Sequence, residues 1–188
     1  QKYNILIFGG SLGAQFFSLE IPKIICSLDQ NVKEKININH QVVSSELKNV
    51  KELYSKHKIK SNVKKFFQNI IKCYKSADLI ISRSGGSTLA EILNLQIPSI
   101  IIPLQNSMDN HQKINSNVIT ENSLGWVFDE DEIKNDNFKI LLNKLILRKK
   151  INNDIFKNYK LFKNNFPTSF KKLPHEIISQ KISNVLNI

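Results

Sequence analysis

Short apolar runs alternate along this chain with longer stretches in which apolar residues recur every three or four positions. Apolar runs of four to eight residues are typical of buried strands, and the longer periodic stretches are typical of amphipathic helices. The pattern predicts six strands, at residues 3–8, 38–43, 62–67, 78–82, 99–103 and 125–128. Helices are predicted at residues 16–28, 44–57 and 70–76, from residue 86, at 110–123, and in three pieces from about residue 135 onward.

This alternation predicts one α/β domain over residues 1–188. Strands that are each followed by a helix form parallel sheets, and right-handed connections place the helices on both faces. We therefore expect a Rossmann-like, doubly wound parallel sheet of six strands. Two helix starts carry favourable N-cap residues, a serine just before Glu46 and Asn69. The last helices are expected to break near Lys150 and between Pro167 and Pro174.

The composition supports a globular domain, with 41% hydrophobic and 23% charged residues among 188. Every apolar run is shorter than the roughly 18 residues of a membrane-spanning helix. We predict no signal peptide, because the chain opens at Gln1 and enters an apolar strand by Tyr3. The abrupt start without methionine leads us to expect a piece of a longer polypeptide.

The two cysteines, Cys26 and Cys73, lie far apart and are flanked by apolar residues. Their spacing fits no metal site, so we expect core thiols in a reducing, cytoplasmic compartment. The histidines and acidic residues also show no pair at metal-ligand spacing. The sequence therefore predicts neither a bound metal nor a cofactor.

The formal charge is +11, and all but two of the 27 basic residues are lysine. Such a charge attracts anionic membrane surfaces or nucleic acid, and the lysines between Lys48 and Lys75 form the best candidate patch. Aromatic residues are not interleaved there for base stacking, and arginine, which reads bases, is nearly absent. We expect no nucleic-acid partner. Solvated lysine faces are favoured, and an anionic membrane surface stays open.

Two glycine-bearing loops follow predicted strands. "GGSLGA", residues 9–14, follows the first strand, and "RSGGST", residues 83–88, follows the fourth. In doubly wound sheets ligands bind outside the carboxyl ends of the strands, which is where both loops belong. The first loop lacks the full G-x-G-x-x-G spacing and is a weak dinucleotide signal by itself.

The second loop has the features of a diphosphate site. Glycines let the backbone approach a ligand, and a helix starting near Gly86 presents free N–H groups with a partial positive charge. Ser87 and Thr88 add hydroxyl donors. Glu91 follows Ser87 by four residues, about 6 Å along the same helix face, where a carboxylate suits the paired hydroxyls of a ribose. A capped helix with a solvent-facing glutamate is an equally open interpretation.

The segment "PLQNSMDNHQKIN", residues 103–115, follows the fifth strand and opens a helix with an Asp-Asn cap. His111 and Gln112 fall in the first turn of this helix, near the same ligand. An amide both donates and accepts, which suits sugar hydroxyls. The alternatives are that Gln112 is a solvated helix residue and that His111 only orients the loop.

The run "DEDE", residues 129–132, contains the D-x-D pattern with which some glycosyltransferases hold a metal–nucleotide complex. It lies between a short strand and a helix, and we expect an exposed acidic turn. No Ser-His-Asp or Cys-His arrangement and no Walker lysine accompany the glycine loops. The predicted site holds a nucleotide diphosphate without a metal.

Four segments carry a family resemblance: "IFGGSLGAQ", "FFQNI", "ADLIISRSGGSTLAEI" and "IPLQNSMDNHQKIN". They resemble the C-terminal half of the MurG family, well over residues 5–128 and in pattern beyond. These bacterial transferases move N-acetylglucosamine from UDP-N-acetylglucosamine to lipid-linked muramyl-pentapeptide (lipid I), making lipid II for peptidoglycan. The resemblance implies a GT-B fold, in which two Rossmann-like domains hold the donor in the cleft between them.

The resemblance also implies roles for individual residues. Ser11 would contact the diphosphate, and Phe67 would present its backbone to the uracil. Glu91 would bind the ribose, and Gln112, with His111 beside it, would bind the N-acetylglucosamine. The start of the phosphate-binding helix would comprise Gly86, Ser87, Thr88, Leu89 and Ala90.

The family's other glycine motif, "GGTGGH", is absent from this chain. The resemblance therefore implies that the acceptor site for lipid I, most of the membrane-binding surface and the general base lie in an N-terminal half outside it. We expect a peripheral enzyme on the cytoplasmic face of the plasma membrane, and a fragment that binds donor weakly without turnover. Three alternatives remain: a related transferase for another UDP-sugar and acceptor, a non-enzymatic subunit of a split transferase, and a plain basic anion-binding domain.

Overall fold

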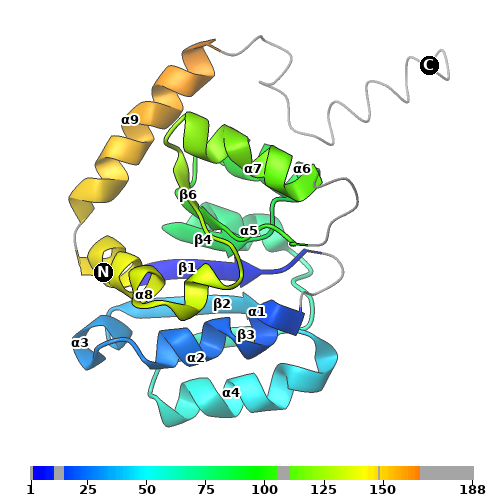
Figure 1. Cartoon of the computed structure of the whole chain (residues 1–188). Coiled ribbons are helices and arrows are strands. Elements are labelled where there is room, and N and C mark those ends of the chain that lie inside the picture. Colours follow the sequence, from blue (N-terminus) through cyan, green and yellow to red (C-terminus); the bar gives the residue numbers. More distant parts are fainter. Residues whose placement is uncertain (1, 11–14, 106–110, 148, 166–188) are drawn as a thin grey trace, which may run out of the picture.

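The computed structural model describes residues 2–10, 15–105, 111–147 and 149–165. Within these ranges six parallel strands form one sheet in the order β3-β2-β1-β4-β5-β6 (Figure 1). The strands are β1 (Tyr3–Phe8), β2 (Ile36–Gln41), β3 (Lys60–Lys64), β4 (Leu79–Ser82), β5 (Ser99–Ile101) and β6 (Gly125–Val127). The order reverses at β1, as in a doubly wound sheet, and the predicted fold class is confirmed.

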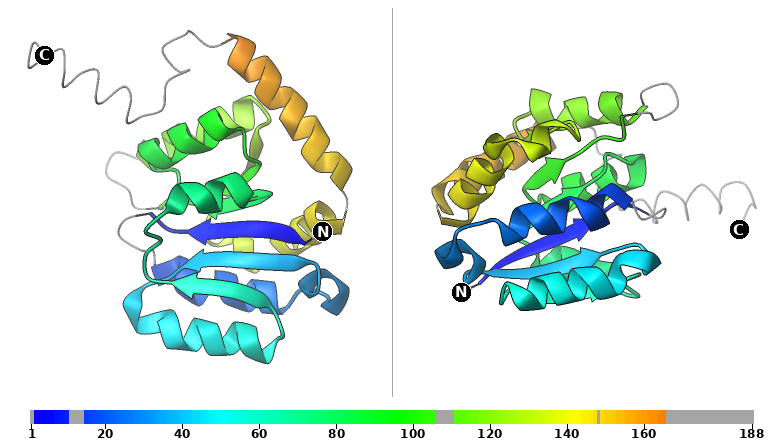
Figure 2. Two further views of the ribbon diagram at one scale, coloured as in Figure 1. Left: turned by 180° about the vertical axis from the view of Figure 1, so that it is seen from behind. Right: turned by 60° about the horizontal axis from the view of Figure 1, so that its bottom comes forward.

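Helices cover both faces of the sheet. They are α1 (Gln15–Leu19), α2 (Ile21–Cys26), α3 (Gln30–Lys33), α4 (Leu47–Lys56), α5 (Ile70–Ser76), α6 (Gly86–Leu95), α7 (His111–Glu121), α8 (Asp136–Leu147) and α9 (Lys149–Asn165), with short 3-10 turns η1 (Ser44–Glu46) and η3 (Glu132–Lys134). Side chains of α1 to α4 and α8 pack on one face, and those of α5, α6, α7 and α9 pack on the other. In Figure 2, α2 and α4 (blue and cyan) lie side by side along the β1–β3 half of the sheet.

Strand β1 shows how the two cores form. Ile5 and Ile7 point into the core under α1, α2, α4 and α8, while Leu6 and Phe8 point into the core under α5, α6 and α9. Successive side chains of a strand face opposite sides, so an almost continuously apolar strand must be covered on both. The prediction that β1 is buried on both faces is confirmed.

Strands β2 and β3 begin two residues earlier than predicted, and β3 ends before Phe67. Their register pairs Asn37 with Lys60 and Asn39 with Asn62. These polar side chains share one face, and β3 is an edge strand with Lys60 and Asn62 exposed. Polar residues at strand starts break the apolar pattern, which placed both strands too late in the chain.

The single helix predicted over residues 16–28 is wrong, because the chain forms α1 and α2 with a break at Glu20. Pro22 lies in the first turn of α2. Its ring prevents the helix from running through from α1, since proline lacks an N–H and clashes with the preceding turn.

Two predicted caps have different outcomes. Asn69 caps α5, because its side-chain oxygen accepts from the Lys72 N–H at 3.1 Å. The predicted serine cap before Glu46 is wrong: Ser44 and Ser45 lie inside η1, and no side-chain cap forms there or at the start of α4. A 3-10 turn leads into α4 through the bond from the Leu47 N–H to the Ser44 carbonyl.

Two of the three predicted tail helices are α8 and α9, which meet near the predicted break at Lys150. Tyr159 of α9 donates its hydroxyl to the Ile97 carbonyl at 2.9 Å, and Asn158 donates to the Ser123 carbonyl at 3.0 Å. These bonds hold α9 along the ends of α6 and α7 (Figure 1). The third tail helix and the break at Pro167 to Pro174 lie outside the described residues.

Both cysteines are free thiols. Cys26 is buried, and its burial raises the pKa of the thiol to about 11. Cys73 is only half-buried, so the expectation of a core thiol holds for Cys26 and is too strong for Cys73. Among the described helices, none combines the length and apolar character that crossing a membrane requires.

Candidate functional site

The two glycine loops meet at one edge of the sheet. Ser82, the last residue of β4, pairs with Phe8 at the end of β1 and with Ile101 at the end of β5. Parallel strands in register bring their carboxyl ends together, so the loops after β1, β4 and β5 share one edge. Ser11, the predicted diphosphate contact, lies outside the described residues.

Gly10 gives the first glycine loop its direction. Its φ is +88°, a left-handed conformation that residues with a Cβ rarely adopt. A Cβ added at Gly10 would meet no atom within 4 Å, so the demand for glycine is conformational and not steric. The chain leaves β1 through this turn, and the next described element is α1.

Helix α6 starts at Gly86, as predicted. Gly85 has extended dihedrals at the cap position, and no side chain caps the helix. Gly86 and Ser87 are exposed and Thr88 is half-buried, and a Cβ at Gly86 would meet no atom within 4 Å. An uncapped helix start beside open space presents N–H groups and a partial positive charge to whatever approaches. Diphosphate binding here stays a prediction.

Three further residues of α6 were predicted to face the donor. Leu89 is buried in the core, so only its backbone can reach a ligand, whereas Ala90 is half-buried. Glu91 is half-buried. Burial raises the pKa of the Tyr74 phenol on α5, and the nearby Glu91 carboxylate raises it further. The half-buried position argues against the open alternative of a purely solvent-facing Glu91.

Sequence reasoning missed Tyr74 as part of the site. It placed this residue in a short predicted helix, and the apolar pattern reads a tyrosine there as core. Nothing in the local sequence says that the carboxylate near this phenol is Glu91, which is 17 positions later in the chain.

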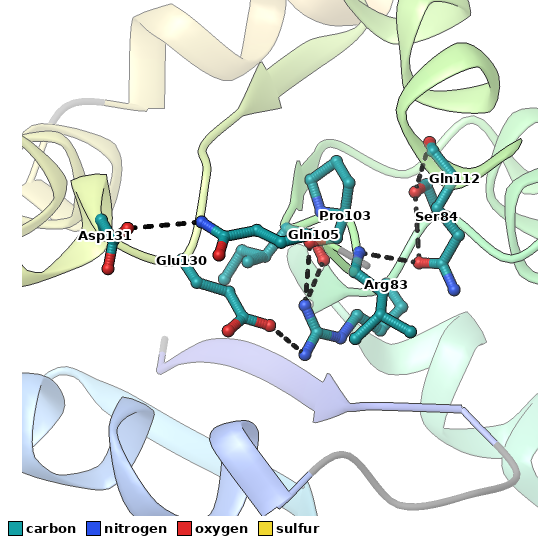
Figure 3. A network of polar contacts seen from close by, with 9 residues as sticks. Arg83, Ser84, Pro103, Gln105, Gln112, Glu130 and Asp131 are labelled. Carbon is teal, nitrogen blue, oxygen red and sulfur yellow. Dashed lines mark hydrogen bonds and ion pairs between the residues drawn. The ribbon is translucent and has the colours of Figure 1, made fainter. Parts of the chain in front are cut away.

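The first turn of α7 is fastened to the β4–α6 loop. The Ser84 hydroxyl donates to the Gln112 carbonyl at 2.7 Å (Figure 3). The Asn115 amide donates to the Ser84 carbonyl at 3.2 Å. The side-chain oxygen of Gln112 accepts from the Leu104 N–H at 3.1 Å. Gln112 is therefore held at the site edge, half-buried, and His111 beside it is exposed. The predicted Asp-Asn cap lies outside the described residues.

Arg83 is a second residue whose role the sequence did not reveal. Its guanidinium donates to the carbonyls of Ile102 and Pro103, at 3.1 and 2.9 Å, and forms an ion pair with Glu130 (Figure 3). It also lies over the rings of Phe16 and Phe17, 5.4 and 5.1 Å from their centroids. Arginine suits this place because its planar fork serves several acceptors and stacks on rings.

The Arg83 contacts join four parts of the molecule: α1, the end of β4, the segment after β5 and the segment after β6. The side chain is only 7% exposed. Glu130 neutralises the charge of Arg83, and two backbone carbonyls accept from its guanidinium. Arg83 therefore supports the edge of the site from the protein interior. The geometry does not present it to a ligand phosphate.

The acidic segment at residues 129–132 is only partly the exposed turn that we predicted: Asp131 and Glu132 are exposed, whereas Asp129 and Glu130 are half-buried. Glu130 is half-buried against Arg83, and Asp131 accepts from the Gln105 amide at 3.4 Å. Asp129 lies 3.9 Å from the Lys113 ammonium. The segment therefore contacts Gln105, which precedes residues 106–110, and Lys113, which follows them. In the described parts of the chain, no three His, Cys, Asp or Glu side chains are grouped to hold a metal ion.

Phe67 lies in the loop after β3, not in the strand. Its side chain is buried in the core that also contains Phe8, Tyr74 and Leu89, while Phe66 beside it is 70% exposed. Because the ring is buried, only the backbone of Phe67 could contact a uracil. That contact stays a prediction. A cleft of about 680 Å³ adjoins it between α5 and the polar face of β2 and β3.

The fold and the arrangement at the sheet edge define a Rossmann-like domain of the GT-B glycosyltransferase class. The crystal structure of Acinetobacter baumannii MurG superposes with a TM-score of 0.74 at 23% identity, covering 86% of this chain and 48% of that one. The lipopolysaccharide glycosyltransferase WaaG superposes with a TM-score of 0.68 at 13% identity, covering 94% and 46%. At these identities the likeness is one of fold.

The chain belongs to the glycosyltransferase family 28 C-terminal domain family, whose model matches residues 4–172. Two curated relatives are each named UDP-N-acetylglucosamine–N-acetylmuramyl-(pentapeptide) pyrophosphoryl-undecaprenol N-acetylglucosamine transferase. The one from Rickettsia rickettsii (strain Sheila Smith) is 35% identical over 98% of this chain and 47% of its own length. The one from Rickettsia felis is 36% identical over 83% and 44%. The chain thus spans about half the length of the relatives it matches.

Proposed function

We propose that this chain is the donor-nucleotide domain of an inverting transferase that converts lipid I to lipid II. The donor would be UDP-N-acetylglucosamine and the acceptor lipid-linked N-acetylmuramyl-pentapeptide, a step of peptidoglycan synthesis. The observation that carries the proposal is the open start of α6 beside the Gly10 turn, with Glu91 one helical turn further in. The names of relatives that are 35% identical support the same reaction.

The proposed donor lies across the carboxyl edge of the sheet. The diphosphate sits at Gly86 to Ala90 and Ser11, and the uracil reads the backbone of Phe67. Glu91 accepts from the ribose hydroxyls. Gln112 and His111, held beside Ser84, face the N-acetylglucosamine. These positions are proposals supported by where the described residues lie.

The chemistry follows from this placement. An acceptor hydroxyl attacks the anomeric carbon from the face opposite the diphosphate, and the glycosidic bond to the β-phosphate oxygen breaks. Negative charge grows on the departing UDP, and the N–H groups at the start of α6 offset it, as preorganised electrostatic stabilisation does. Ribose and sugar contacts supply orientation. The proposal needs no resident metal and assigns the general base to a domain outside this chain.

The proposed enzyme works at the cytoplasmic face of the plasma membrane, where its acceptor would be presented by the second domain. Many lysines of residues 48–75 are exposed, which gives this domain a surface that an anionic membrane attracts. This attraction would be secondary to acceptor binding, and it predicts a peripheral association that salt weakens.

Calorimetric titration with UDP-N-acetylglucosamine, UDP and ADP tests the proposal. We expect binding that prefers uridine, and about a tenfold loss in Glu91→Ala, since a hydrogen bond to a charged group is worth about 1.5–3 kcal/mol. Glu52→Ala is the matched control, because Glu52 lies on α4 in an exposed pair with Lys48 at 3.9 Å. Its affinities should equal those of the unchanged chain.

Two outcomes would contradict the proposal. Equal binding of all three ligands that collapses with salt would mean a plain anion site. Detectable lipid II synthesis by this chain alone would contradict the assignment of the base to another domain.

One observation keeps a second candidate in view: the chain covers only 44–47% of the curated relatives cited above. A donor-binding subunit of a split transferase would have this extent. A matching N-terminal half in the same reading frame would exclude that candidate. Titration with other UDP-sugars would separately test a related transferase with a different donor.

A further inference from the structure

We propose that Ser84 is a positioning residue for the sugar end of the donor. Its hydrogen bonds fasten the start of α7 to the β4–α6 loop and hold Gln112 at a fixed place relative to α6. The inference rests on the proposed function, because it takes Gln112 as the contact to the N-acetylglucosamine and the start of α6 as the diphosphate site. Ser84 itself carries none of the donor contacts predicted from the sequence.

Burial decides how Ser84 can act. The residue lies two positions before Gly86, where α6 begins, and it is 0% exposed. A buried hydroxyl is paired with a protein group or ordered water, because leaving it unpaired costs free energy. Since protein atoms cover Ser84, it can influence a donor only through the residues that it holds.

Ser84 forms two hydrogen bonds with the first turn of α7, one in each direction. Its hydroxyl donates to the Gln112 carbonyl at 2.7 Å (Figure 3). Its backbone carbonyl accepts from the Asn115 amide at 3.2 Å. The two partners are three residues apart on the same helix turn, so the pair of bonds restricts both sliding and rotation of that turn.

Apolar packing holds the later part of α7 and not its first turn. His111 and Lys113 are exposed, and Ile114 is 61% exposed. Ile119, about two turns after Gln112, is the first buried apolar side chain of this helix. The place of the first turn therefore depends on polar contacts.

The polar contacts of Gln112 reach two different segments. The Leu104 N–H donates to the Gln112 side chain at 3.1 Å and ties it to the segment after β5. The Ser84 bonds tie the same turn to the loop that opens α6. Because the diphosphate and the sugar are covalently joined in the donor, the groups that bind them must keep a set distance. Holding these groups in place before the donor arrives reduces the ordering cost of binding.

A pair of ligands isolates this effect. UDP occupies the proposed nucleotide and diphosphate positions, and UDP-N-acetylglucosamine adds the sugar at Gln112. In Ser84→Ala we expect calorimetry to show an unchanged affinity for UDP. The affinity for UDP-N-acetylglucosamine should fall about three- to tenfold, as expected for the loss of one hydrogen bond. A general loss of fold would weaken both ligands equally, so the ratio of the two affinities separates positioning from stability.

The matched control is Ser116→Ala. Ser116 is 2% exposed, and its hydroxyl donates to the Lys113 carbonyl at 2.7 Å, the length of the Ser84 bond, but within α7. This variant also removes a buried hydroxyl, yet the bond that it loses joins no second element. Its affinities for both ligands should equal those of the unchanged chain.

Two further variants test whether Ser84 acts through Gln112. Ser84→Cys keeps a side chain of similar shape with a weaker donor, so its loss should lie between those of serine and alanine. Gln112→Ala should lower the affinity for UDP-N-acetylglucosamine relative to UDP. Adding Ser84→Ala to Gln112→Ala should lower this ratio no further, because both changes remove the same contact.

Four results would each overturn the inference and leave the proposed function intact. They are an unchanged ratio in Ser84→Ala, equal losses for both ligands in that variant, as large a loss in Ser116→Ala, and a further loss in the double variant. An unchanged ratio in Gln112→Ala would overturn the proposed sugar contact and the inference with it. Failure of the unchanged chain to prefer UDP over ADP would overturn the proposed function as well.

Discussion

At the scale of single residues, the site edge depends on partners that are distant in sequence. Arg83 is adjacent to the glycines of the β4–α6 loop, yet its charge is matched by Glu130, which is 47 positions later. An arginine beside a phosphate-binding motif suggests a phosphate ligand until its surroundings are known. Here the surroundings are two carbonyls, two phenylalanine rings and a carboxylate, so Arg83 supports the loop from the protein side.

Glu130→Ala is therefore predicted to destabilise the fold. Removing one partner of a buried ion pair leaves an uncompensated charge, which costs about 3 kcal/mol or more, and the 22% exposure of Glu130 places this site at the low end. Urea unfolding measures the loss. Glu52→Ala, which breaks an exposed pair on α4, is expected to cost below about 0.5 kcal/mol. Equal effects of the two changes would contradict a structural role for the Arg83–Glu130 pair.

At the scale of elements, helix starts were predicted best where glycine or asparagine marks them. The starts of α5 and α6 agree with the sequence pattern because Asn69 caps one and the Gly85–Gly86 turn opens the other. The break between α1 and α2 was missed although Pro22 marks it. The apolar period continues across that proline and therefore predicts one continuous helix. The proline lacks an N–H, and this breaks the helix in spite of the period.

The start of α6 gives a prediction in which stability and binding separate. Gly86→Ala places a Cβ in open space on a helical residue, so it is expected to keep or raise stability, by up to about 1 kcal/mol. The same methyl group stands where the proposed diphosphate approaches the backbone, so UDP affinity should fall severalfold. Thermal unfolding and calorimetry measure the two quantities.

Gly10→Ala is the contrasting variant for the α6 experiment. Its φ of +88° predicts a loss of about 1–2 kcal/mol, although a Cβ there also meets open space. Tighter UDP binding by Gly86→Ala would contradict the placement of the diphosphate at α6.

At the scale of the whole molecule, the charge of +11 is spread over many exposed lysines and only two arginines. Spread charge attracts an anionic surface without a defined site, and the attraction is screened within about 10 Å at 0.1 M salt. The exposed Phe66 lines the same cleft as Lys64 and Lys72, and Lys65 is its neighbour in the chain. Removing the same number of charges at two different places tests whether Lys64, Lys65 and Lys72 form a local membrane contact.

Vesicle sedimentation can compare two variants that each lose three lysine charges. We expect the chain to bind phosphatidylglycerol vesicles at low salt, to dissociate near 0.5 M salt, and to ignore phosphatidylcholine vesicles. Replacing Lys64, Lys65 and Lys72 by glutamine should weaken binding as much as replacing Lys134, Lys157 and Lys160. A much larger loss from the first set would contradict a spread attraction and identify a local membrane contact.

The fold class was determined by the sequence, because periods of two and of 3.6 in the apolar residues are local properties of strands and helices. The two-sided core around β1 and the placement of both glycine loops at the carboxyl edge follow from that alternation and from the handedness of its connections. The strand order β3-β2-β1-β4-β5-β6 came from the structure. Family membership and the start of α6 were also accessible, since glycine and hydroxyl residues act on the backbone next to them. The predicted donor contacts at Ser11, Phe67, His111 and Gln112 stay predictions.

Only the tertiary structure decided which side chains meet across elements. The Arg83–Glu130 pair, the Ser84–Gln112 bond and the contact of Gln105 with Asp131 each join residues from different elements. Such contacts depend on the angles at which helices cross a twisted sheet, and no local period encodes those angles. The same reason places Glu130 of the acidic segment against Arg83, while Asp131 and Glu132 stay exposed as predicted.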